Sequence, residues 1–456
     1  MTPMPTFTNE TEAVTYIFQS MRKLRGQTRP PDDLGRDPAP TRRLIDALGL
    51  LDRPREYVVV TGSKGKGSTT AITAKLLQIL GHRVGMITSP HLVSWRERIR
   101  VNGQAIPETD FLRLISEFAP TIDSIEATLS ETQYFSPTGI FLALALRWFD
   151  EQGVNVAVLE VGRGGRFDDI ALVPNKLSLF TPITLEHTFW LGPTLERIAW
   201  HKAGIIKPHS RAYSVPQAPE VMQVLAAEAE TQDAQFDWVV QMDMARYVGP
   251  APDGMRIRLG RYGEMTLALR GRYQLANATL ATLGVGDVHA RLGGIPHASE
   301  EYRERIRTGL ATVQWPGRLF KLQDSPAIYL DGAVTGESAQ SVVESLQDSW
   351  THPLVSIIAV PDDKDYPGVY AALGKVSDSV ILTQTDRNPI LNFLDADTAL
   401  AAARQFNQHV THMVSLEQAV EEARQSAGTD GTILIVGTHS IMADAMLLWV
   451  YSFETI

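Results

Sequence analysis

The sequence predicts an α/β protein with two parallel-sheet domains, a larger one at residues 1–312 and a smaller, doubly wound one at 313–456. Three observations predict this fold class. A β-branched run at 57–60 leads into a glycine-rich turn and then into a helical pattern. Short apolar strands then alternate with helical segments, which is typical of a parallel sheet covered on both faces. After the proline and glycine at 316–317, the same alternation starts afresh.

The first series contains four expected strands, the helix that follows the glycine-rich turn, and further helices. Two alternating runs joined by a glycine-containing turn predict a β-hairpin over 254–271. The Pro- and Arg-rich stretch 25–43 predicts a surface loop before the first strand, either ordered or mobile. We expect strands at 57–60, 82–90, 155–162 and 177–184, and helices at 139–153 and 271–285.

The second series begins near Val313 and contains five expected strands. Helical segments separate them, so this part is expected to form the smaller doubly wound domain. The sequence has no internal repeat and no low-complexity tract. We expect strands at 327–333, 354–360, 379–385, 409–414 and 432–438, with helices such as Glu337–Gln347 and Leu416–Arg424 between them.

Composition excludes several classes of function. A formal net charge of -10 and a pI of about 5.6 argue against non-specific nucleic-acid binding as the main task. The chain has no cysteine, which excludes disulfides, zinc thiolates and cysteine nucleophiles. It has no apolar stretch of about 18 residues, and its first residues lack a basic-then-apolar signal. We therefore expect a cytoplasmic protein without a membrane partner.

The stretch from Val58 to Leu77 predicts a phosphate-binding loop of unusual form. The common pattern, Gly, four residues, then Gly-Lys-Ser/Thr, is not met, because Gly67 follows Lys66 and the hydroxyl comes one place late at Ser68. The glycines still lie at a strand-to-helix turn, where backbone N–H groups and the helix dipole attract anions. An ordinary glycine-rich turn with a surface lysine is the alternative.

Three polar residues follow apolar strands or lie in apolar surroundings. Glu160 ends the strand 156–159, at the carboxyl edge where parallel sheets bind ligands. His187 follows the next strand at a similar edge. Lys202, in the segment HKAGIIKP, has an apolar setting that lowers a lysine pKa enough for reaction with carbon dioxide. The alternatives are a solvent-facing carboxylate, a structural histidine and a helix-capping lysine.

Seven blocks along the chain together resemble the Mur ligase superfamily. They are TGSKGKGST, SPHLVSWRERIRVNG, LEVGRGGRFD, ITLEHTFWLGPTLERIAWHKAGIIKP, GRYQLANA, WPGRL and LDGA. The resemblance is greatest to the branch of folylpolyglutamate and dihydrofolate synthases. It implies an N-terminal P-loop-type ATPase domain and a smaller C-terminal Rossmann-like domain. The family's phosphate loop has the form Gly-x-x-Gly-Lys-Gly-Ser, which Gly62 to Ser68 matches.

The resemblance implies an ADP-forming amide ligase, in which ATP activates a carboxylate as an acyl phosphate and an amine then displaces phosphate. It implies that Asn277 contacts adenine, Arg318 the phosphates and Asp331 the ribose. Two magnesium sites are implied, with Ser68 as a ligand of the first ion, His187 as a ligand of the second, and Glu160 as a further magnesium ligand. Carbamylation of Lys202 is implied as well. The implied catalytic residues are Lys66, His187 and Lys202, and the implied phosphate-loop contacts are Gly62, Ser63, Lys64, Gly65, Lys66, Gly67, Ser68 and Thr69.

The sequence departs from the family pattern at positions that the resemblance places near the substrates. Ser63-Lys64 replaces the usual Thr-Asn, which adds a cation near the phosphates. Val334-Thr335-Gly336 replaces His-Asn-Pro, and the missing histidine normally helps to hold the amino acid. Thr138-Gly139 replaces Phe-Glu, and Asp169-Ile170-Ala171 replaces Ala-Thr-Asn.

These departures lead us to predict an ATP-dependent ligase that is a paralogue of folylpolyglutamate synthase with an altered substrate. L-Glutamate is then expected to be a poor acceptor, because valine offers no hydrogen bond. Two alternatives stay open, a genuine folylpolyglutamate or dihydrofolate synthase that adds L-glutamate and a nucleotide-binding protein without catalysis. The expected partners are a small carboxylic acid and an amine, with no nucleic acid, in a monomer or small homo-oligomer.

Overall fold

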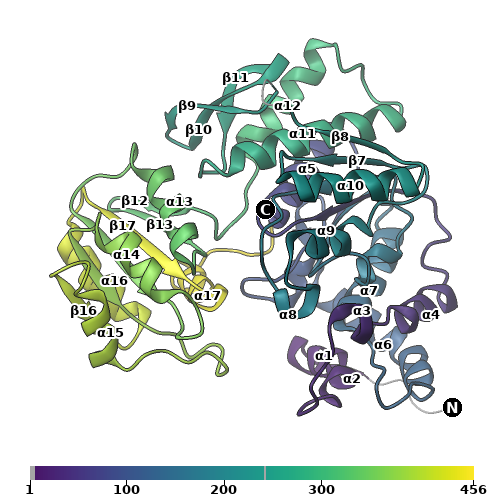
Figure 1. Ribbon diagram of the computed structural model, residues 1–456, viewed down its shortest axis with the longest axis horizontal. Coiled ribbons are helices and arrows are strands. Elements are labelled where there is room, and N and C mark those ends of the chain that lie inside the picture. Colours follow the sequence, from purple (N-terminus) through teal and green to yellow (C-terminus); the bar gives the residue numbers. More distant parts are fainter. Residues whose placement is uncertain (1–5, 241–242) are drawn as a thin grey trace.

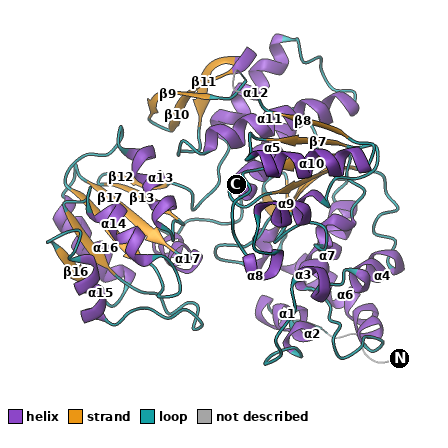
Figure 2. Cartoon of the chain, viewed as in Figure 1, coloured by secondary structure: helices purple, strands orange, loops and turns teal. Residues whose placement is uncertain are grey.

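The protein forms two lobes of unequal size, as the computed structural model shows for residues 6–240 and 243–456 (Figure 1). The larger lobe holds the N-terminal two thirds of the chain, and the smaller lobe holds the C-terminal third. Helices and strands alternate in both lobes (Figure 2). The α/β fold class expected from the sequence is confirmed. The helix before the expected boundary at 312/313 ends at Thr312, and the boundary itself stays a prediction.

The larger lobe is organised around an eight-stranded sheet with the order β4-β3-β2-β5-β1-β6-β7-β8. The six strands from β2 to β8 in this order run parallel, and β3 and β4 are antiparallel additions at one edge. The sequence did not predict β3, β4, β7 or β8. The strands are β1 Glu56–Thr61, β2 Val84–Ile87, β3 Ile99–Val101, β4 Gln104–Ala105, β5 Val156–Glu160, β6 Leu177–Phe180, β7 Arg211–Ser214 and β8 Gln235–Trp238.

Helices cover both faces of this sheet, because the central strands are apolar on both sides. Val59 faces one hydrophobic core, and its neighbours Val58 and Val60 face the other. Helices α5, α11 and α12 close the second face. The helices of this lobe are α1 Glu10–Ile17, α2 Gln19–Arg22, α3 Asp32–Gly35, α4 Ala39–Ala47, α5 Lys66–Ile79, α6 Glu108–Glu126, α7 Pro137–Glu151, α8 Thr188–Leu191, α9 Leu195–Ala203, α10 Pro219–Thr231, α11 Gln274–Arg291 and α12 Glu300–Thr312.

The stretch 25–43, expected to be a loop, contains α3 and the first part of α4. Proline at the first turn of a helix is compatible with helical geometry, because that position needs no N–H partner. Pro40 has this place in α4 and is buried. The prediction of a surface loop was therefore only partly right, since the prolines start a helix instead of excluding one.

A small antiparallel sheet packs against α12, with the strand order β11-β10-β9. The hairpin expected over 254–271 is confirmed by β10 (Gly254–Leu259) and β11 (Gly263–Leu267). The third strand, β9 (Arg246–Ala251), was not expected. Apolar residues of this sheet, including Ile257 and Leu267, belong to the same core as α5 and α11.

The smaller lobe is the expected doubly wound domain. Its sheet has the order β12-β13-β17-β14-β15-β16, and all its pairs except β12–β13 are parallel. The strands are β12 Phe320–Asp324, β13 Ala327–Asp331, β14 Leu354–Ala359, β15 Ser379–Leu382, β16 Val410–His412 and β17 Thr432–Gly437. The helices are α13 Gly336–Leu346, α14 Tyr366–Gly374, α15 Ala396–Ala403, α16 Leu416–Ala427 and α17 His439–Leu448.

The end of the chain returns from the smaller lobe to the larger one, where Figure 1 marks the C-terminus. Glu454 forms an ion pair with Arg96, 2.8 Å away. The buried guanidinium of Arg100 donates to the carbonyl oxygens of Phe453 and Glu454. A β-bridge pairs Gln104 with Thr455 in the antiparallel sense. Two separate chain segments, this tail and the connection near 313–319, therefore join the lobes.

Candidate active site

The phosphate loop connects the end of β1 to the start of α5, as expected. Gly62 has φ of +146°, and a Cβ at this position would overlap the hydroxyl of Thr181 and lie 2.8 Å from its carbonyl oxygen. Gly65 is the N-cap of α5 in the left-handed conformation, with φ of +85°. Both positions require glycine, because L side chains rarely adopt these angles. The loop can therefore present its N–H groups to an anion at the helix N-terminus.

Lys66 lies inside this loop as the first residue of α5. Its Nζ donates to the carbonyl oxygens of Gly62, at 3.0 Å, and Ser63, at 3.4 Å. Ser63 is held from outside the loop, since its backbone N–H donates to the carbonyl of Pro182 over 2.7 Å. Lys64 is exposed. The extra cation that distinguishes this loop is therefore at its outer surface, and Lys66 is at its centre.

Helix α11 packs on the first turn of α5 and brings two amides against the loop. Asn277 accepts a hydrogen bond from Thr69 Oγ1 at 3.3 Å and donates to Gln274. Gln274 donates to Ser68 Oγ over 3.2 Å. Gln274 was not singled out in the sequence, although it lies in the same GRYQLANA block as Asn277. The contact with adenine that was expected of Asn277 stays a prediction.

Glu160 ends β5 directly beside β1, with its backbone opposite Val60. Its side chain is buried, and one carboxylate oxygen accepts the backbone N–H of Ser89 at 3.0 Å. No ion pair holds this carboxylate within residues 6–240 and 243–456. Burial raises its pKa to about 7, and this shift is opposed most strongly by the charge of Lys66, then by the hydrogen bond from Ser89 and by the charges of Arg318 and Arg98. A buried carboxylate without an ion pair is suited to a bound cation.

His187 and Lys202 lie on the other side of the loop. His187 is the N-cap of α8 with φ of +52°, and burial lowers its pKa. Lys202 is 1% exposed, and its Nζ donates to Gly62 O over 2.7 Å. Burial, assisted by the charge of Lys66, lowers the pKa of Lys202 to about 7, although Glu186 at 3.5 Å opposes this shift. Glu186 was not identified from the sequence, where only its proximity to His187 could have indicated it.

The smaller lobe contributes Arg318 and Asp331 to the same region. Asp331 ends β13 and is buried, and its Oδ2 accepts the N–H of Leu319 at 2.8 Å and the hydroxyl of Tyr273 at 3.3 Å. This arrangement holds the turn that carries Arg318. The guanidinium of Arg318 is close enough to Glu160 to lower its pKa. The structure therefore brings together residues from both lobes that the sequence predicted to act together.

The donor set at the phosphate loop fits magnesium better than a metal held by protein alone. No group of three or more His, Asp or Glu that could hold a metal is found within residues 6–240 and 243–456. Magnesium usually takes one or two carboxylates together with phosphate oxygens and water. Glu160 supplies the carboxylate and Ser68 a buried hydroxyl, so the residues present are compatible with a nucleotide-bound ion.

One departure from the family pattern has a clear steric reason. A Cβ on Gly139 would overlap the hydroxyl of Thr41 and lie 2.8 Å from Asp169 Oδ1. The buried Asp169 therefore occupies the space that a side chain at 139 would need. Arg36, from the segment before α4, pairs with Asp169 at 3.6 Å and with Asp168 at 3.2 Å. The lack of a side chain at 139 therefore leaves room for both Thr41 and the buried Asp169.

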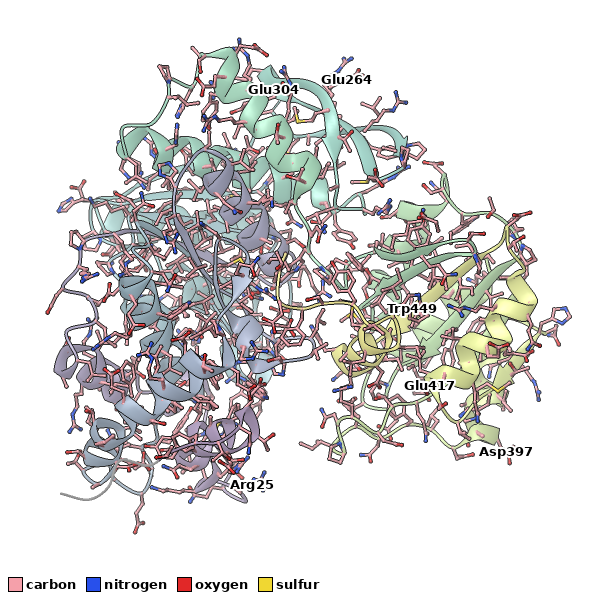
Figure 3. All side chains as sticks on the ribbon, turned by 180° about the vertical axis from the view of Figure 1, so that it is seen from behind. Arg25, Glu264, Glu304, Asp397, Glu417 and Trp449 are labelled. Atoms are coloured by element: carbon pink, nitrogen blue, oxygen red, sulfur yellow. The ribbon has the colours of Figure 1, made fainter. Side chains whose placement is uncertain are left out.

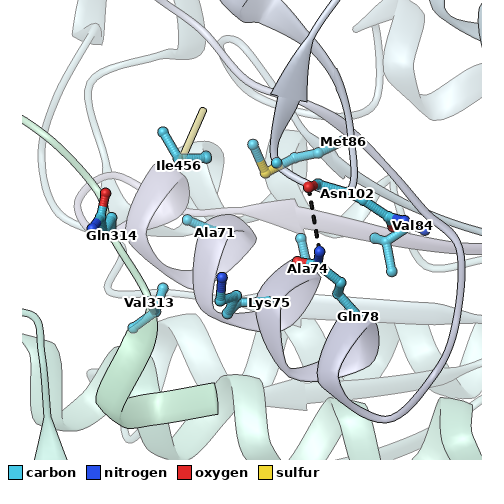
Figure 4. Close-up of a pocket in the computed structure, with 11 residues that line it drawn as sticks. Ala71, Ala74, Lys75, Gln78, Val84, Met86, Asn102, Val313, Gln314 and Ile456 are labelled. Atoms are coloured by element: carbon cyan, nitrogen blue, oxygen red, sulfur yellow. Dashed lines mark hydrogen bonds between the residues drawn. The ribbon is translucent and has the colours of Figure 1, made fainter. Parts of the chain in front are cut away.

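The pocket drawn in Figure 4 lies apart from these residues. It runs along α5 beyond the phosphate loop, and Gln78 donates to the carbonyl of Asn102 at its margin. Ile456 of the returning tail closes one side. None of the expected site residues lines it. The candidate active site is therefore defined by side-chain contacts at the phosphate loop.

Two family models match this chain in the order that the fold requires. The Mur ligase middle domain matches residues 60–285, and the Mur ligase glutamate ligase domain matches residues 317–439. Dihydrofolate synthase/folylpolyglutamate synthase of Bacillus subtilis is 31% identical over 353 residues, which cover 76% of this chain and 80% of that protein. The protein of the same description from Mycobacterium tuberculosis is 32% identical over 412 residues, with 85% and 82% covered.

A solved structure agrees with the whole fold. Folylpolyglutamate synthase of Mycobacterium tuberculosis, complexed with ADP and AMPPCP, has a TM-score of 0.79 at 28% identity. The match covers 96% of this chain and 99% of that one. Fold and site thus define an ADP-forming carbon–nitrogen ligase that uses ATP. The chain belongs to the Mur ligase superfamily, in its folylpolyglutamate synthase and dihydrofolate synthase branch.

The relatives do not support the first substrate hypothesis derived from the sequence. They are described as folylpolyglutamate or dihydrofolate synthases, which fits the alternative hypothesis better than an altered-substrate paralogue.

Across residues 6–240 and 243–456, no helix is long and apolar enough to span a membrane.

Proposed function

We propose that this chain joins a pteroate- or folate-type carboxylic acid to L-glutamate. The supporting observation is the convergence of Lys66, Glu160 and Arg318, from two lobes, at one phosphate loop. The match of the smaller lobe to a glutamate ligase domain supports L-glutamate as the amine. The descriptions of the relatives support a folate-type acid. They name folate enzymes, and the matches to this chain cover 80% and 82% of those two proteins.

The proposed reaction has two steps with balanced bonds. A carboxylate oxygen of the acid attacks the γ-phosphorus of ATP, the bond to the β-phosphate oxygen breaks, and ADP leaves. The amine nitrogen then attacks the acyl carbon, the carbon–oxygen bond to phosphate breaks, and the nitrogen loses a proton. Phosphoryl transfer of this kind depends on positioning and charge neutralisation. Lys66, inside the phosphate loop, and Arg318, from the smaller lobe, would supply the positive charge.

Magnesium, when bound, would neutralise phosphate charge in this site. Ser68 and Glu160 would hold the ion next to the phosphate loop, and His187 would serve a second one. Burial without an ion pair raises the pKa of Glu160, and a bound cation would offset this shift by favouring the ionised carboxylate.

Lys202 is proposed to carry a carbamate. Its pKa of about 7 leaves a large neutral fraction near neutral pH, so the nitrogen lone pair can attack carbon dioxide with loss of a proton. The product carries a negative charge where the protonated lysine carries a positive one. In the unmodified protein, Lys202 Nζ lies 2.7 Å from the carbonyl oxygen of Gly62 in the phosphate loop. Replacing the ammonium by a carbamate suits a position next to a metal-bound nucleotide, because Lys66 already supplies a positive charge there.

Competition between amines tests the proposal directly. The purified enzyme receives dihydropteroate or a reduced folate, ATP, magnesium and an equimolar mixture of amino acids, and mass spectrometry identifies the products. We expect the glutamyl product to exceed every other by about tenfold or more. Preference for another amine would instead favour the altered-acceptor hypothesis, for which Val334 is the specific observation. No product with any amine would favour nucleotide binding without catalysis.

A further inference from the structure

The carboxyl edge of the smaller sheet places two loops side by side. Strand β13 pairs in parallel with β17, and Asp331 lies opposite Val436. Val334 and His439 each come three residues after these paired positions, so they leave adjacent strands near the same edge. Ligands bind at this edge in open parallel sheets. In the first loop Val334 is apolar and the hydroxyl of Thr335 caps α13, whereas the second loop offers the imidazole of His439.

The first turn of α17 packs beside Arg318. Met442 is one turn after His439, and a Cβ on Gly317 would be 2.9 Å from its sulfur. A Cβ on Gly332 would be 3.0 Å from Met442 Cε and 2.7 Å from Arg318 Nη1. Residues three apart in a helix share one face. His439 therefore begins α17 on the face that meets the arginine proposed to bind phosphate.

His439 also faces the larger lobe. Helix α17, whose end is marked by Trp449, lies on the side of the smaller lobe nearest the larger one (Figures 1 and 3). The charge interactions of His439 reach Arg318 in its own lobe and His91 in the other. Leu92, next to His91, packs against the core of the smaller lobe. The imidazole is thus at the junction of the lobes, next to the phosphate site.

The polar atoms at this point have unused hydrogen-bonding capacity. Burial, followed by the charge of Arg318, lowers the pKa of His439 to about 4, so its ring is neutral near pH 7 with one donor nitrogen. Neither ring nitrogen forms a hydrogen bond within residues 6–240 and 243–456. The hydroxyl of Thr438 is buried and also unpartnered in this part of the chain. A buried hydroxyl without a partner is costly, so that of Thr438 favours a ligand at this point, and the half-buried ring of His439 beside it is free to donate to the same ligand.

We propose that His439 determines the amine specificity of the reaction by donating a hydrogen bond to a carboxylate of L-glutamate. This inference rests on the proposed function and names the residue that recognises the acceptor amino acid, L-glutamate. The side chain of Val334 has no hydrogen-bond donor, and His439, which follows the neighbouring strand β17, supplies one. Glutamate is then retained as the acceptor even though the loop after β13 carries no imidazole.

Steady-state kinetics of His439→Ala test the inference. Loss of a hydrogen bond to a charged group should raise the KM for L-glutamate by about 10- to 150-fold. The KM values for ATP and for the acid should not change, because the proposal assigns His439 to the acceptor amino acid alone. His409→Ala is the matched control, since His409 is exposed near β16 at the far edge of the same sheet, and all its constants should equal those of the wild type. Thermal unfolding confirms that each variant is folded.

A second variant separates recognition from local structure. Val334→His in the His439→Ala background returns an imidazole to the adjacent strand exit, and it should recover most of the lost affinity for glutamate. Unchanged glutamate KM in His439→Ala would overturn the inference, as would an equal rise in all three KM values. Wild-type activity with glutamate is measured first. Its absence would overturn the proposed function itself, which keeps the two failures distinct.

Discussion

Lys202 Nζ lies 2.7 Å from the carbonyl oxygen of Gly62, so a lysine of α9 directly contacts the first glycine of the phosphate loop. The two residues are 140 positions apart in the chain. Because Lys66 donates to the same carbonyl at 3.0 Å, two lysines share one acceptor. Their mutual repulsion adds to burial in lowering the pKa of Lys202.

This relationship predicts a carbamate on Lys202 that depends on pH. At a pKa of about 7, half of the side chains are neutral at pH 7, compared with about 0.04% for an ordinary lysine. Carbon-13 NMR with labelled bicarbonate should show one carbamate signal, which is absent in Lys202→Ala. The signal should weaken as the pH falls below about 7, because protonation removes the lone pair. Lys207→Ala should leave the signal unchanged, and its loss there would reassign the site.

Lys66→Ala should remove most turnover without unfolding the protein. Within the part of the chain that the structure describes, the side chain of Lys66 donates hydrogen bonds only to carbonyl oxygens of its own loop, so its loss breaks no ion pair there. Losing one charge contact to the transferred phosphate should lower kcat by about 10²-fold or more. Phosphate release under saturating substrates measures this. Lys75→Ala, on the same helix away from the loop, should keep wild-type turnover; a near-normal rate for Lys66→Ala would refute its assigned role.

Metal dependence should be strict and sensitive to Glu160 and His187. Excess chelator should abolish activity, and added magnesium should restore it. Glu160→Gln and His187→Ala should each raise the magnesium concentration for half-maximal rate by at least about tenfold, because each removes a proposed ligand. Glu230→Gln, an exposed change on α10, serves as the control. Unchanged magnesium titrations in both variants would show that the ion binds elsewhere.

Gly62→Ala should destabilise the protein more than an ordinary glycine replacement at positive φ. A Cβ at 62 would lie 2.8 Å from the backbone carbonyl of Thr181, which cannot move away as a side chain could. Gly153→Ala is the matched control, since Gly153 has φ of +64° and no atom within 4 Å of a Cβ. The control should cost about 1–2 kcal/mol of unfolding free energy. Chemical denaturation compares the two, and equal losses would show that the contact with Thr181 is relieved.

Several elements of this protein were determined by sequence that is local in the chain. The β-branched run at 57–60 and the glycines after it predict a strand, a turn and a helix, because backbone angles and hydrophobic periodicity depend on neighbouring residues. Five of the six strands of the smaller lobe were predicted for the same reason, whereas β12 was not expected. The family blocks indicated the phosphate loop, Glu160 and His187 as one site, and the structure places them around β1.

Tertiary structure alone decided the order of the strands and the contacts between distant segments. Periodicity does not say that β1 lies between β5 and β6, yet this order brings Glu160 and Thr181 to opposite sides of the loop. The ion pair of Arg96 with Glu454 spans 358 positions and has no local signal. The placement of His439 beside the exit of β13 depends on the pairing of β13 with β17. Such pairings are set by packing among all elements at once, whereas the local pattern fixes only which element each segment forms.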